Sequence, residues 1–149
     1  MNPEAFPILI AEDNSADAEL MELALKKAGF KGTVRFVGDG HEAVEYLKGE
    51  GPYEDRSEFP FPRVIISDLK MPRVSGLELL QWLRRHPQCH IVPLILLSGS
   101  GLEADVAAAY KLGANTYFQK PTQFQELVAL LKNLGAYWAK SELPEVALA

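Results

Sequence analysis

Several features that would assign the sequence to a special class are missing from it. The chain of 149 residues has a single cysteine, Cys89, so it cannot form an internal disulfide. No apolar stretch approaches the roughly 20 residues needed to cross a bilayer, and no run of Lys or Arg is longer than a pair. The N-terminal MNPEAFPILI lacks the basic region and the apolar core of a signal peptide. We therefore expect a cytoplasmic protein that binds neither membrane nor nucleic acid.

The composition that is present is typical of a globular domain. Hydrophobic residues make up 48% of the chain and charged residues 23%, and the formal net charge is a mild -5. A chain of this length can bury a core without disulfides or metal staples. We expect one domain over 1–149, with a core at about 8–134 and a C-terminal helix extension and tail at 135–149. This leaves no room for a second domain.

Short apolar runs alternate with segments that have helical spacing. Strands are expected at 8–11, 34–37, 64–67, 94–97 and 116–118, and four of these lack the strict two-residue alternation of half-exposed strands. A helical pattern follows each strand. The apolar helical positions are Leu20, Leu23, Ala24 and Ala28; Ala43, Val44 and Leu47; Leu79, Leu80 and Leu83; Ala104, Ala107, Ala108 and Leu112; and Leu127, Leu130, Leu131 and Leu134. The pattern predicts an α/β fold of the flavodoxin-like (βα)5 type, a doubly wound parallel sheet with strand order 2-1-3-4-5.

Local signals support these helix starts, and one connection is long. Capping-box spacing is found for Asp39 before Glu42, Ser75 before Glu78, and Thr122 before Gln125. The connection at 48–63 contains three prolines and two glycines. We expect it to be a surface excursion, with docking of a partner as the alternative.

Acidic residues directly follow two of the expected strands. Asp68 comes after the strand at 64–67, and Glu12 and Asp13 come after the strand at 8–11. In the expected order these strands are neighbours, and ligands of such sheets bind beyond the carboxyl ends of the strands. Three converging carboxylates repel one another unless a cation lies among them, and Mg²⁺ suits acid oxygens, backbone carbonyls and waters.

A hydroxyl and an ammonium complete this edge of the sheet. Ser98 lies at the end of the fourth strand and Lys120 follows the fifth. With the acids they describe a site for a phosphoryl group, in which Mg²⁺ and Lys120 neutralise oxygens while a carboxylate attacks phosphorus. Taken singly, Asp68 can be a helix cap or turn former, and Glu12 and Asp13 can simply open the first helix. The coincidence at four strand ends favours the phosphoryl site.

Four motifs stand at these positions: AEDN, SDLKMPRVSG, LLSG and YFQKP. In this order they resemble the acidic pair, the phosphorylation site, the switch hydroxyl, and the aromatic and lysine-proline positions of the receiver domain of two-component response regulators, over about 8–134. The 48–63 loop and the C-terminal tail are similar to those of the stand-alone regulators that serve phytochromes and other hybrid sensor kinases.

The resemblance assigns the acidic residues their roles. Asp68 would accept the phosphoryl group. Glu12, Asp13, Asp68 and the backbone carbonyl of Lys70 would hold Mg²⁺. No functional position departs from the family pattern.

The same resemblance implies a signalling switch with slow autodephosphorylation, and not a turnover enzyme. A sensor histidine kinase or phosphotransfer protein would supply the phosphoryl group, and Ser98 and Lys120 would bind its oxygens. Tyr117, the switch aromatic, would rotate inward and reshape the face formed by the fourth helix, fifth strand and fifth helix, where partners or a second copy would bind. With no output domain in the sequence, the signal would pass by protein contact, or the protein would act as a phosphate sink.

Two other classes of function remain as alternatives. GSGLEA at 99–104 fits the dinucleotide fingerprint, but it follows the fourth strand, whereas that motif belongs after the first. A phosphatase with an aspartate nucleophile would normally have a second acid two residues after Asp68, and that position is Lys70. Both alternatives are therefore less well supported than the phosphoacceptor.

Other residues that attract attention have simpler explanations. His86, Cys89 and His90 have no evident fourth ligand, and Pro87 ends the helix there, so a surface turn is favoured over a metal site. His41 is expected to be solvated. Trp82 is expected to pack or to lie half exposed, with partner docking as the alternative.

Overall fold

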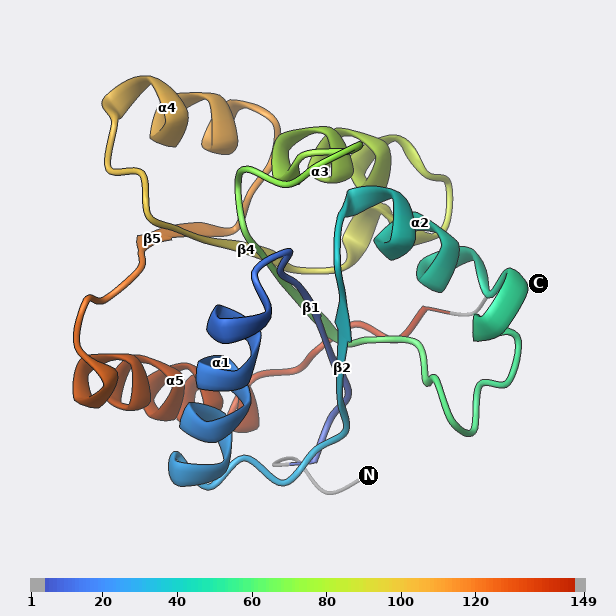
Figure 1. Cartoon of the computed structure of the whole chain (residues 1–149). Helices are drawn as coiled ribbons and strands as arrows, with labels where there is room; N and C mark the ends of the chain where they lie inside the picture. The colour runs from blue at the N-terminus through green and yellow to red at the C-terminus, as the bar shows by residue number, and fades with distance from the viewer. Residues whose placement is uncertain (1–4, 147–149) are drawn as a thin grey trace.

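A five-stranded parallel sheet forms the centre of the molecule (Figure 1). The computed structural model describes residues 5–146. The strands lie in the order β2-β1-β3-β4-β5, which confirms the predicted flavodoxin-like (βα)5 fold. They are β1 (Ile8–Ala11), β2 (Val34–Val37), β3 (Val64–Ser67), β4 (Leu94–Ser98) and β5 (Thr116–Gln119).

Helices cover both faces of the sheet. In Figure 1, α1 and α5 lie together on one face, and α2, α3 and α4 lie on the other. The helices are α1 (Ser15–Lys27), α2 (Gly40–Lys48), α3 (Gly76–Arg85), α4 (Glu103–Lys111) and α5 (Phe124–Ala139), with short 3-10 turns η1 (Gly51–Tyr53) and η2 (Cys89–Ile91). None of these helices, all within residues 5–146, has the length and apolar character of a membrane span.

The three central strands are buried along their whole length. In β1, Leu9 and Ala11 face the core beneath α2, α3 and α4, while Ile8 and Ile10 face the core beneath α1 and α5. Each fully buried Leu or Ile side chain stabilises the fold by about 1.5–3 kcal/mol. The edge strands β2 and β5 are only partly buried, so the prediction of burial on both faces holds for the central strands alone.

Two of the three predicted capping boxes supply helix caps. Asp39 accepts from the Glu42 amide at 2.8 Å and Ser75 accepts from the Glu78 amide at 3.2 Å. The prediction for Thr122 is wrong. Helix α5 begins one residue later than the pattern suggests, so its N-cap position is Gln123, which makes no side-chain cap bond.

The buried faces of α1 and α4 also differ from the prediction. In α1, Leu20 and Leu23 are exposed, and Met21 and Leu25 are buried beside the correctly predicted Ala24. In α4 the one buried residue is Ala109, which was not among the predicted positions. The apolar positions of these two helices therefore do not all face the sheet.

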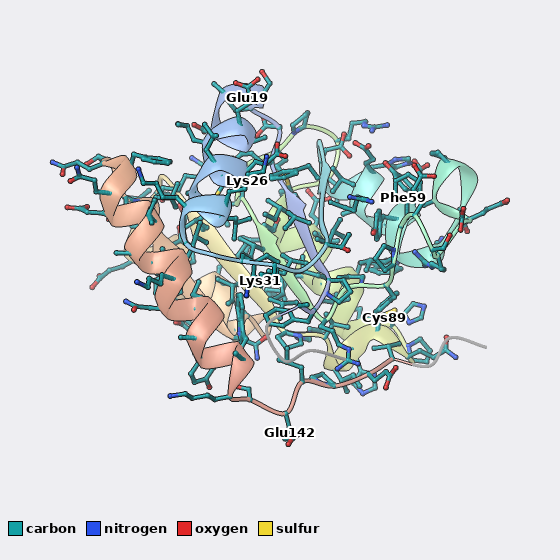
Figure 2. All side chains as sticks on the ribbon, turned by 90° about the horizontal axis from the view of Figure 1, so that it is seen from below. Glu19, Lys26, Lys31, Phe59, Cys89 and Glu142 are labelled. Carbon is teal, nitrogen blue, oxygen red and sulfur yellow. The ribbon has the colours of Figure 1, made fainter. Side chains whose placement is uncertain are left out.

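The connection at 48–63 is a surface loop that is hydrogen-bonded to α2. The Arg56 guanidinium donates to the carbonyls of Tyr46 at 2.8 Å and Leu47 at 3.0 Å, in the last turn of α2. The Tyr46 hydroxyl donates in turn to the Pro60 carbonyl at 2.8 Å. Figure 2 shows Phe59 of this connection on the side of the molecule away from α5.

The single-domain interpretation of 1–149 stays a prediction. Helix α5 itself continues past the expected core boundary to Ala139, and an extended tail follows it to residue 146.

Candidate functional site

The register of the sheet brings the acidic residues to one edge. Ala11 of β1 pairs with Ser67 of β3, so the residues that follow them, Glu12 and Asp68, leave the sheet side by side. The Asp68 amide donates to the Ala11 carbonyl at 2.9 Å, which carries the pairing one residue further. Carboxylate oxygens of Glu12, Asp13 and Asp68 lie within 4.8 Å of one another. The structure therefore contains the predicted three-carboxylate cluster.

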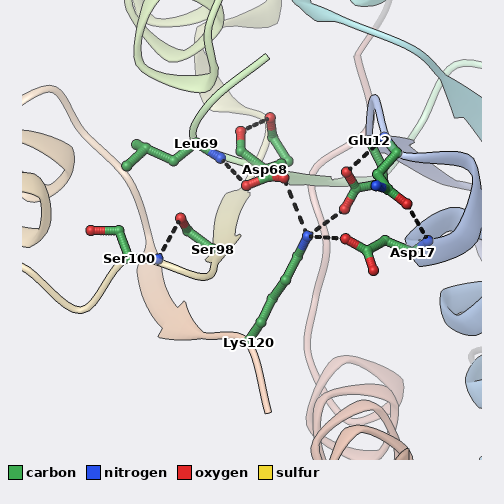
Figure 3. A network of polar contacts seen from close by, with 9 residues as sticks. Glu12, Asp17, Asp68, Leu69, Ser98, Ser100 and Lys120 are labelled. Carbon is green, nitrogen blue, oxygen red and sulfur yellow. Dashed lines mark hydrogen bonds and ion pairs between the residues drawn. The ribbon is translucent and has the colours of Figure 1, made fainter. Parts of the chain in front are cut away.

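Lys120 reaches into this cluster from the end of β5 (Figure 3). Its Nζ lies 2.5 Å from Glu12 Oε1, 3.2 Å from Asp68 Oδ2 and 3.4 Å from Asp17 Oδ2. The Lys120 amide donates to the Ser98 carbonyl at 2.6 Å, which ties the ends of β4 and β5 together. Asp17 was not predicted. The signal that could have found it is its place in the first turn of α1, just beyond the acidic pair.

The carboxylates of the site outnumber the Lys120 ammonium that lies among them. Burial raises the pKa of Glu12, although its hydrogen bond with Lys120 opposes that effect. Burial would lower the pKa of Lys120, but Glu12 and Asp68 outweigh it and raise this pKa above its usual range. The Lys120 ammonium thus contacts three carboxylates, those of Glu12, Asp17 and Asp68, and Asp13 adds a fourth carboxylate to the cluster. The excess of acid oxygens suits a divalent metal ion such as Mg²⁺.

The loop after β3 holds the Asp68 side chain close to its own backbone. The Leu69 amide donates to Asp68 Oδ1 at 2.7 Å, which leaves Oδ2 toward Lys120. The Gly76 amide donates to the Leu69 carbonyl at 2.8 Å. A Cβ atom at Gly76 would lie 2.1 Å from the Asp68 carbonyl oxygen, so only glycine fits there.

Ser98 and Tyr117 lie on two sides of the loop that follows β4. Ser98 is 3% exposed, and its Oγ accepts from the Ser100 amide at 3.2 Å. The Tyr117 hydroxyl donates to the Ser100 carbonyl at 2.7 Å. An open pocket of about 570 Å³ is lined by Ser98 and Ser100 together with Asp68, Lys70 and Lys120. The structure therefore brings Ser98 and Lys70 to the acidic site and places Tyr117 against the same loop.

The remaining candidates take no part in this site. His86 Nδ1 accepts from the backbone amides of Gln88 and Cys89, which forms the predicted turn, but Cys89 itself is buried in the core and does not lie on the surface. His41 is exposed, and its Nδ1 lies 2.9 Å from Glu45 Oε1. Trp82 is half-buried, as predicted, with its ring 5.1 Å from that of His86. Within residues 5–146, Glu12, Asp13 and Asp68 are the one group of three His, Cys, Asp or Glu residues close enough to share a metal ion.

The fold and this strand-end site define a class of protein, and sequence comparison agrees with it. Residues 8–132 match the response regulator receiver domain family. The chain therefore belongs to the receiver domains of response regulators, which are phosphoacceptor signalling switches. Receiver domains bind Mg²⁺ or Mn²⁺ in an acidic pocket and interact with histidine kinases or phosphotransfer proteins. The pocket of Glu12, Asp13 and Asp68 can bind Mg²⁺ in the same way.

Individual relatives are similar over nearly the whole chain. The response regulator Rcp1 of Synechocystis is 30% identical, with 95% of this chain and 96% of Rcp1 covered. The crystal structure of response regulator RPA3017 in red light signaling of R. palustris has a TM-score of 0.88 at 29% identity, covering 93% of this chain and 98% of that one. The phosphorylated cyanobacterial phytochrome response regulator RcpA has a TM-score of 0.85 at 32% identity, covering 95% and 99%. Neither the nucleotide-binding nor the phosphatase alternative finds support among these relatives.

Proposed function

We propose that this protein accepts a phosphoryl group on Asp68 from a sensor histidine kinase or a phosphotransfer protein. The observation that carries the proposal is the position of Asp68 Oδ2, which lies 3.2 Å from Lys120 Nζ at the edge of the three-carboxylate cluster. A nucleophilic carboxylate beside an ammonium and a metal-binding cluster is the arrangement that phosphoryl transfer needs. If a sensor histidine kinase or a phosphotransfer protein is the donor, we expect this protein to act in the cytoplasm.

Each residue of the site has a defined part in the transfer. Glu12, Asp13, Asp68 and the Lys70 carbonyl would hold Mg²⁺, which would supply positive charge to neutralise the phosphoryl oxygens. An Asp68 oxygen forms a bond to phosphorus as the bond from phosphorus to the donor imidazole nitrogen breaks, and that nitrogen keeps the electron pair. Lys120 Nζ then exchanges its carboxylate contact for a phosphoryl oxygen.

The switch begins at Ser98. Phosphorylation adds about 1.5 to 2 negative charges and new acceptor oxygens at the strand ends, so the Ser98 hydroxyl turns to donate to them. In the unphosphorylated structure, the Ser98 Oγ accepts from the Ser100 amide, and the Ser100 carbonyl accepts from the Tyr117 hydroxyl. The Tyr117 hydroxyl already contacts this loop, so an inward rotation of Tyr117 would change an existing contact. The face formed by α4, β5 and α5 then changes, and a partner or second copy binds there.

The names of the relatives indicate the kind of donor and the possible use of the phosphoryl group. RPA3017 is described in red light signaling and RcpA as a phytochrome response regulator, which supports a phytochrome-type sensor kinase upstream. Slow hydrolysis of the acyl phosphate returns the switch to its starting state. A phosphate sink is the second candidate function, because the same chemistry serves it.

Mass spectrometry of the intact protein tests the phosphoacceptor. Incubation with Mg²⁺ and acetyl phosphate should add one phosphoryl group to the wild type and none to Asp68→Asn, because an amide cannot form the acyl phosphate. Asp55→Asn, an exposed position in the 48–63 connection, is the matched control and should be labelled normally. Undiminished labelling of Asp68→Asn would overturn the assignment.

A further inference from the structure

The loop that carries Asp68 contains a strained residue. Arg73 has a φ of 63°, and it is the one non-glycine residue between 5 and 146 with a positive φ. A side chain with a Cβ rarely adopts this left-handed conformation, and it persists only where the surroundings enforce it. Something outside the loop therefore holds Arg73 in place.

That partner is Asp39, at the junction between β2 and α2. The Arg73 Nε donates to Asp39 Oδ2 at 2.8 Å. Asp39 is 6% exposed, although it carries a carboxylate. Its other oxygen accepts from the Glu42 amide at 2.8 Å and caps α2. One buried acid thus joins the start of α2 to the loop after β3.

A second contact beside this ion pair presses the same two segments together. The Gly40 amide donates to the Val74 carbonyl at 2.9 Å. A Cβ atom at Gly40 would lie 2.6 Å from that carbonyl oxygen, so the approach requires glycine. At the far end of the loop the Gly76 amide is bonded to the Leu69 carbonyl. Lys70 lies between these anchored points.

We propose that Asp39 is a positioning residue for the phosphoacceptor site: through Arg73 it fixes the shape of the loop at 68–75. This loop presents both the Asp68 carboxylate and the Lys70 carbonyl to the metal. The inference builds on the proposed function, because its consequence is a pocket preorganised for Mg²⁺. It adds a residue from the second β/α junction, whose side chain contacts neither the metal ligands nor Lys120 in the structure.

Asp39→Asn separates this role from helix capping. Asn caps a helix about as well as Asp, but it is neutral, and its NH2 group, in place of Oδ2, cannot accept a hydrogen bond from Arg73. We expect the backbone amide signals of residues 69–75 to shift in the NMR spectrum of the metal-free protein. Titration with Mg²⁺ should show an affinity lower by on the order of 10-fold, the loss typical of an outer-shell partner.

Two substitutions of Arg73 provide the matched comparison. Arg73→Ala loses the anchor but keeps the Cβ atom that makes a positive φ unfavourable, so the loop should leave this conformation and Mg²⁺ binding should weaken as it does in Asp39→Asn. Arg73→Gly also loses the anchor, but glycine adopts a positive φ without strain, so its affinity should stay closer to that of the wild type. Leu130→Ala, on the opposite face of the sheet, controls for a general loss of stability and should leave Mg²⁺ affinity unchanged.

The outcomes separate this inference from the proposed function. If Asp39→Asn lowers the melting temperature while the 69–75 amides and the Mg²⁺ affinity match the wild type, Asp39 is only a structural cap and the inference is overturned. Equal Mg²⁺ affinities for Arg73→Ala and Arg73→Gly would also overturn it. If the wild type takes no phosphoryl group but Asp39→Asn still displaces the loop and weakens Mg²⁺ binding, the proposed function fails and the positioning role stands.

Discussion

At the scale of single residues, Lys120 makes the acidic site compatible with a stable fold. Its ammonium contacts Glu12, Asp17 and Asp68, all of which would otherwise face one another without a counter-charge. Asp13 belongs to the same cluster but has no contact with Lys120 among those found in residues 5–146, and it is exposed. Asp13 is therefore the acid whose repulsion is least compensated in the absence of metal.

Asp13→Ala should have opposite effects on metal binding and on stability. We expect Mg²⁺ affinity to fall by more than about 10-fold, the loss typical of an outer-shell partner. The metal-free protein should gain a few tenths of a kcal/mol in unfolding free energy, because one of the clustered charges is gone. Isothermal titration calorimetry and urea unfolding without metal measure the two effects, with Glu19→Ala, an exposed acid of α1, as control. A lower stability of metal-free Asp13→Ala would count against the cluster.

Asp39 makes stability depend on pH. Burial opposes its ionisation, but the Glu42 amide and the Arg73 guanidinium outweigh burial and hold the pKa of Asp39 below its ordinary value of 3.8. The Asp39 carboxylate therefore binds a proton more readily in the unfolded chain than in the folded protein. The contribution to stability is therefore present above pH 3.8 and is lost as pH falls below it.

Urea unfolding over a series of pH values tests this dependence. At neutral pH the wild type should exceed Asp39→Asn in unfolding free energy by about 1 kcal/mol. The difference should narrow as pH falls below 3.8. A difference that stays constant through the acid range would show that the Asp39 charge contributes nothing to it.

At the scale of elements, most of the site was predictable because it lies at strand ends. Parallel strands in a known order must bring their carboxyl ends to one edge, so Glu12, Asp68, Ser98 and Lys120 were placed correctly from the sequence. The ion pair between Asp39 and Arg73 was not predictable. It joins two loops whose approach depends on how α2 and α3 pack, which local patterns do not encode.

Helix faces show a second limit of the sequence patterns. Apolar residues of α1 and α4 follow more than one helical stripe, and the sheet selects which stripe is buried. In α1 the selected residues include Met21 and Leu25, while Leu20 and Leu23 remain on the surface. In α3 the apolar residues form a single stripe, and all three predicted positions are buried.

The 48–63 connection gives a prediction at this scale. Arg56 donates to two carbonyls in the last turn of α2, and its guanidinium lies 5.8 Å from the Tyr46 ring centroid and 5.7 Å from that of Phe61. Arg56→Ala should therefore lower the unfolding free energy by about 2 kcal/mol. Chemical denaturation measures the loss. Arg85→Ala, at an exposed position of α3, should change stability by less than about 0.5 kcal/mol; an equally small change for Arg56→Ala would show that the connection is not fastened as described.

At the scale of the whole molecule, two hydrophobic cores on opposite faces of the sheet are joined by the C-terminal tail. Leu143 packs against the core beneath α1 and α5, and Val146 packs against the core beneath α2, α3 and α4. Arg63, just before β3, donates to the Leu143 carbonyl at 3.4 Å. The sequence indicated a tail, but its path across the molecule depends on contacts with distant segments.

Among the five helices, α4, which follows the loop beside the site, has the fewest buried residues. Helix α4 buries only Ala109 and has no side-chain cap at its start, where Leu102 is 65% exposed. An element with few buried contacts moves at low cost in free energy. Helix α4 directly follows the loop after β4, in which Ser100 is hydrogen-bonded to both Ser98 and Tyr117. The helix with the fewest buried residues therefore lies next to the proposed switch residues.

A charge placed on Asp68 should change the face formed by α4, β5 and α5. Two-dimensional NMR of the metal-free protein and of the protein with Mg²⁺ and beryllofluoride, which mimics the acyl phosphate, tests it most directly. We expect shifts at Asp68, Ser98 and Lys120, and further shifts at Tyr117 and along α4 and α5. Shifts confined to the pocket, with Tyr117 and α5 unmoved, would contradict the switch.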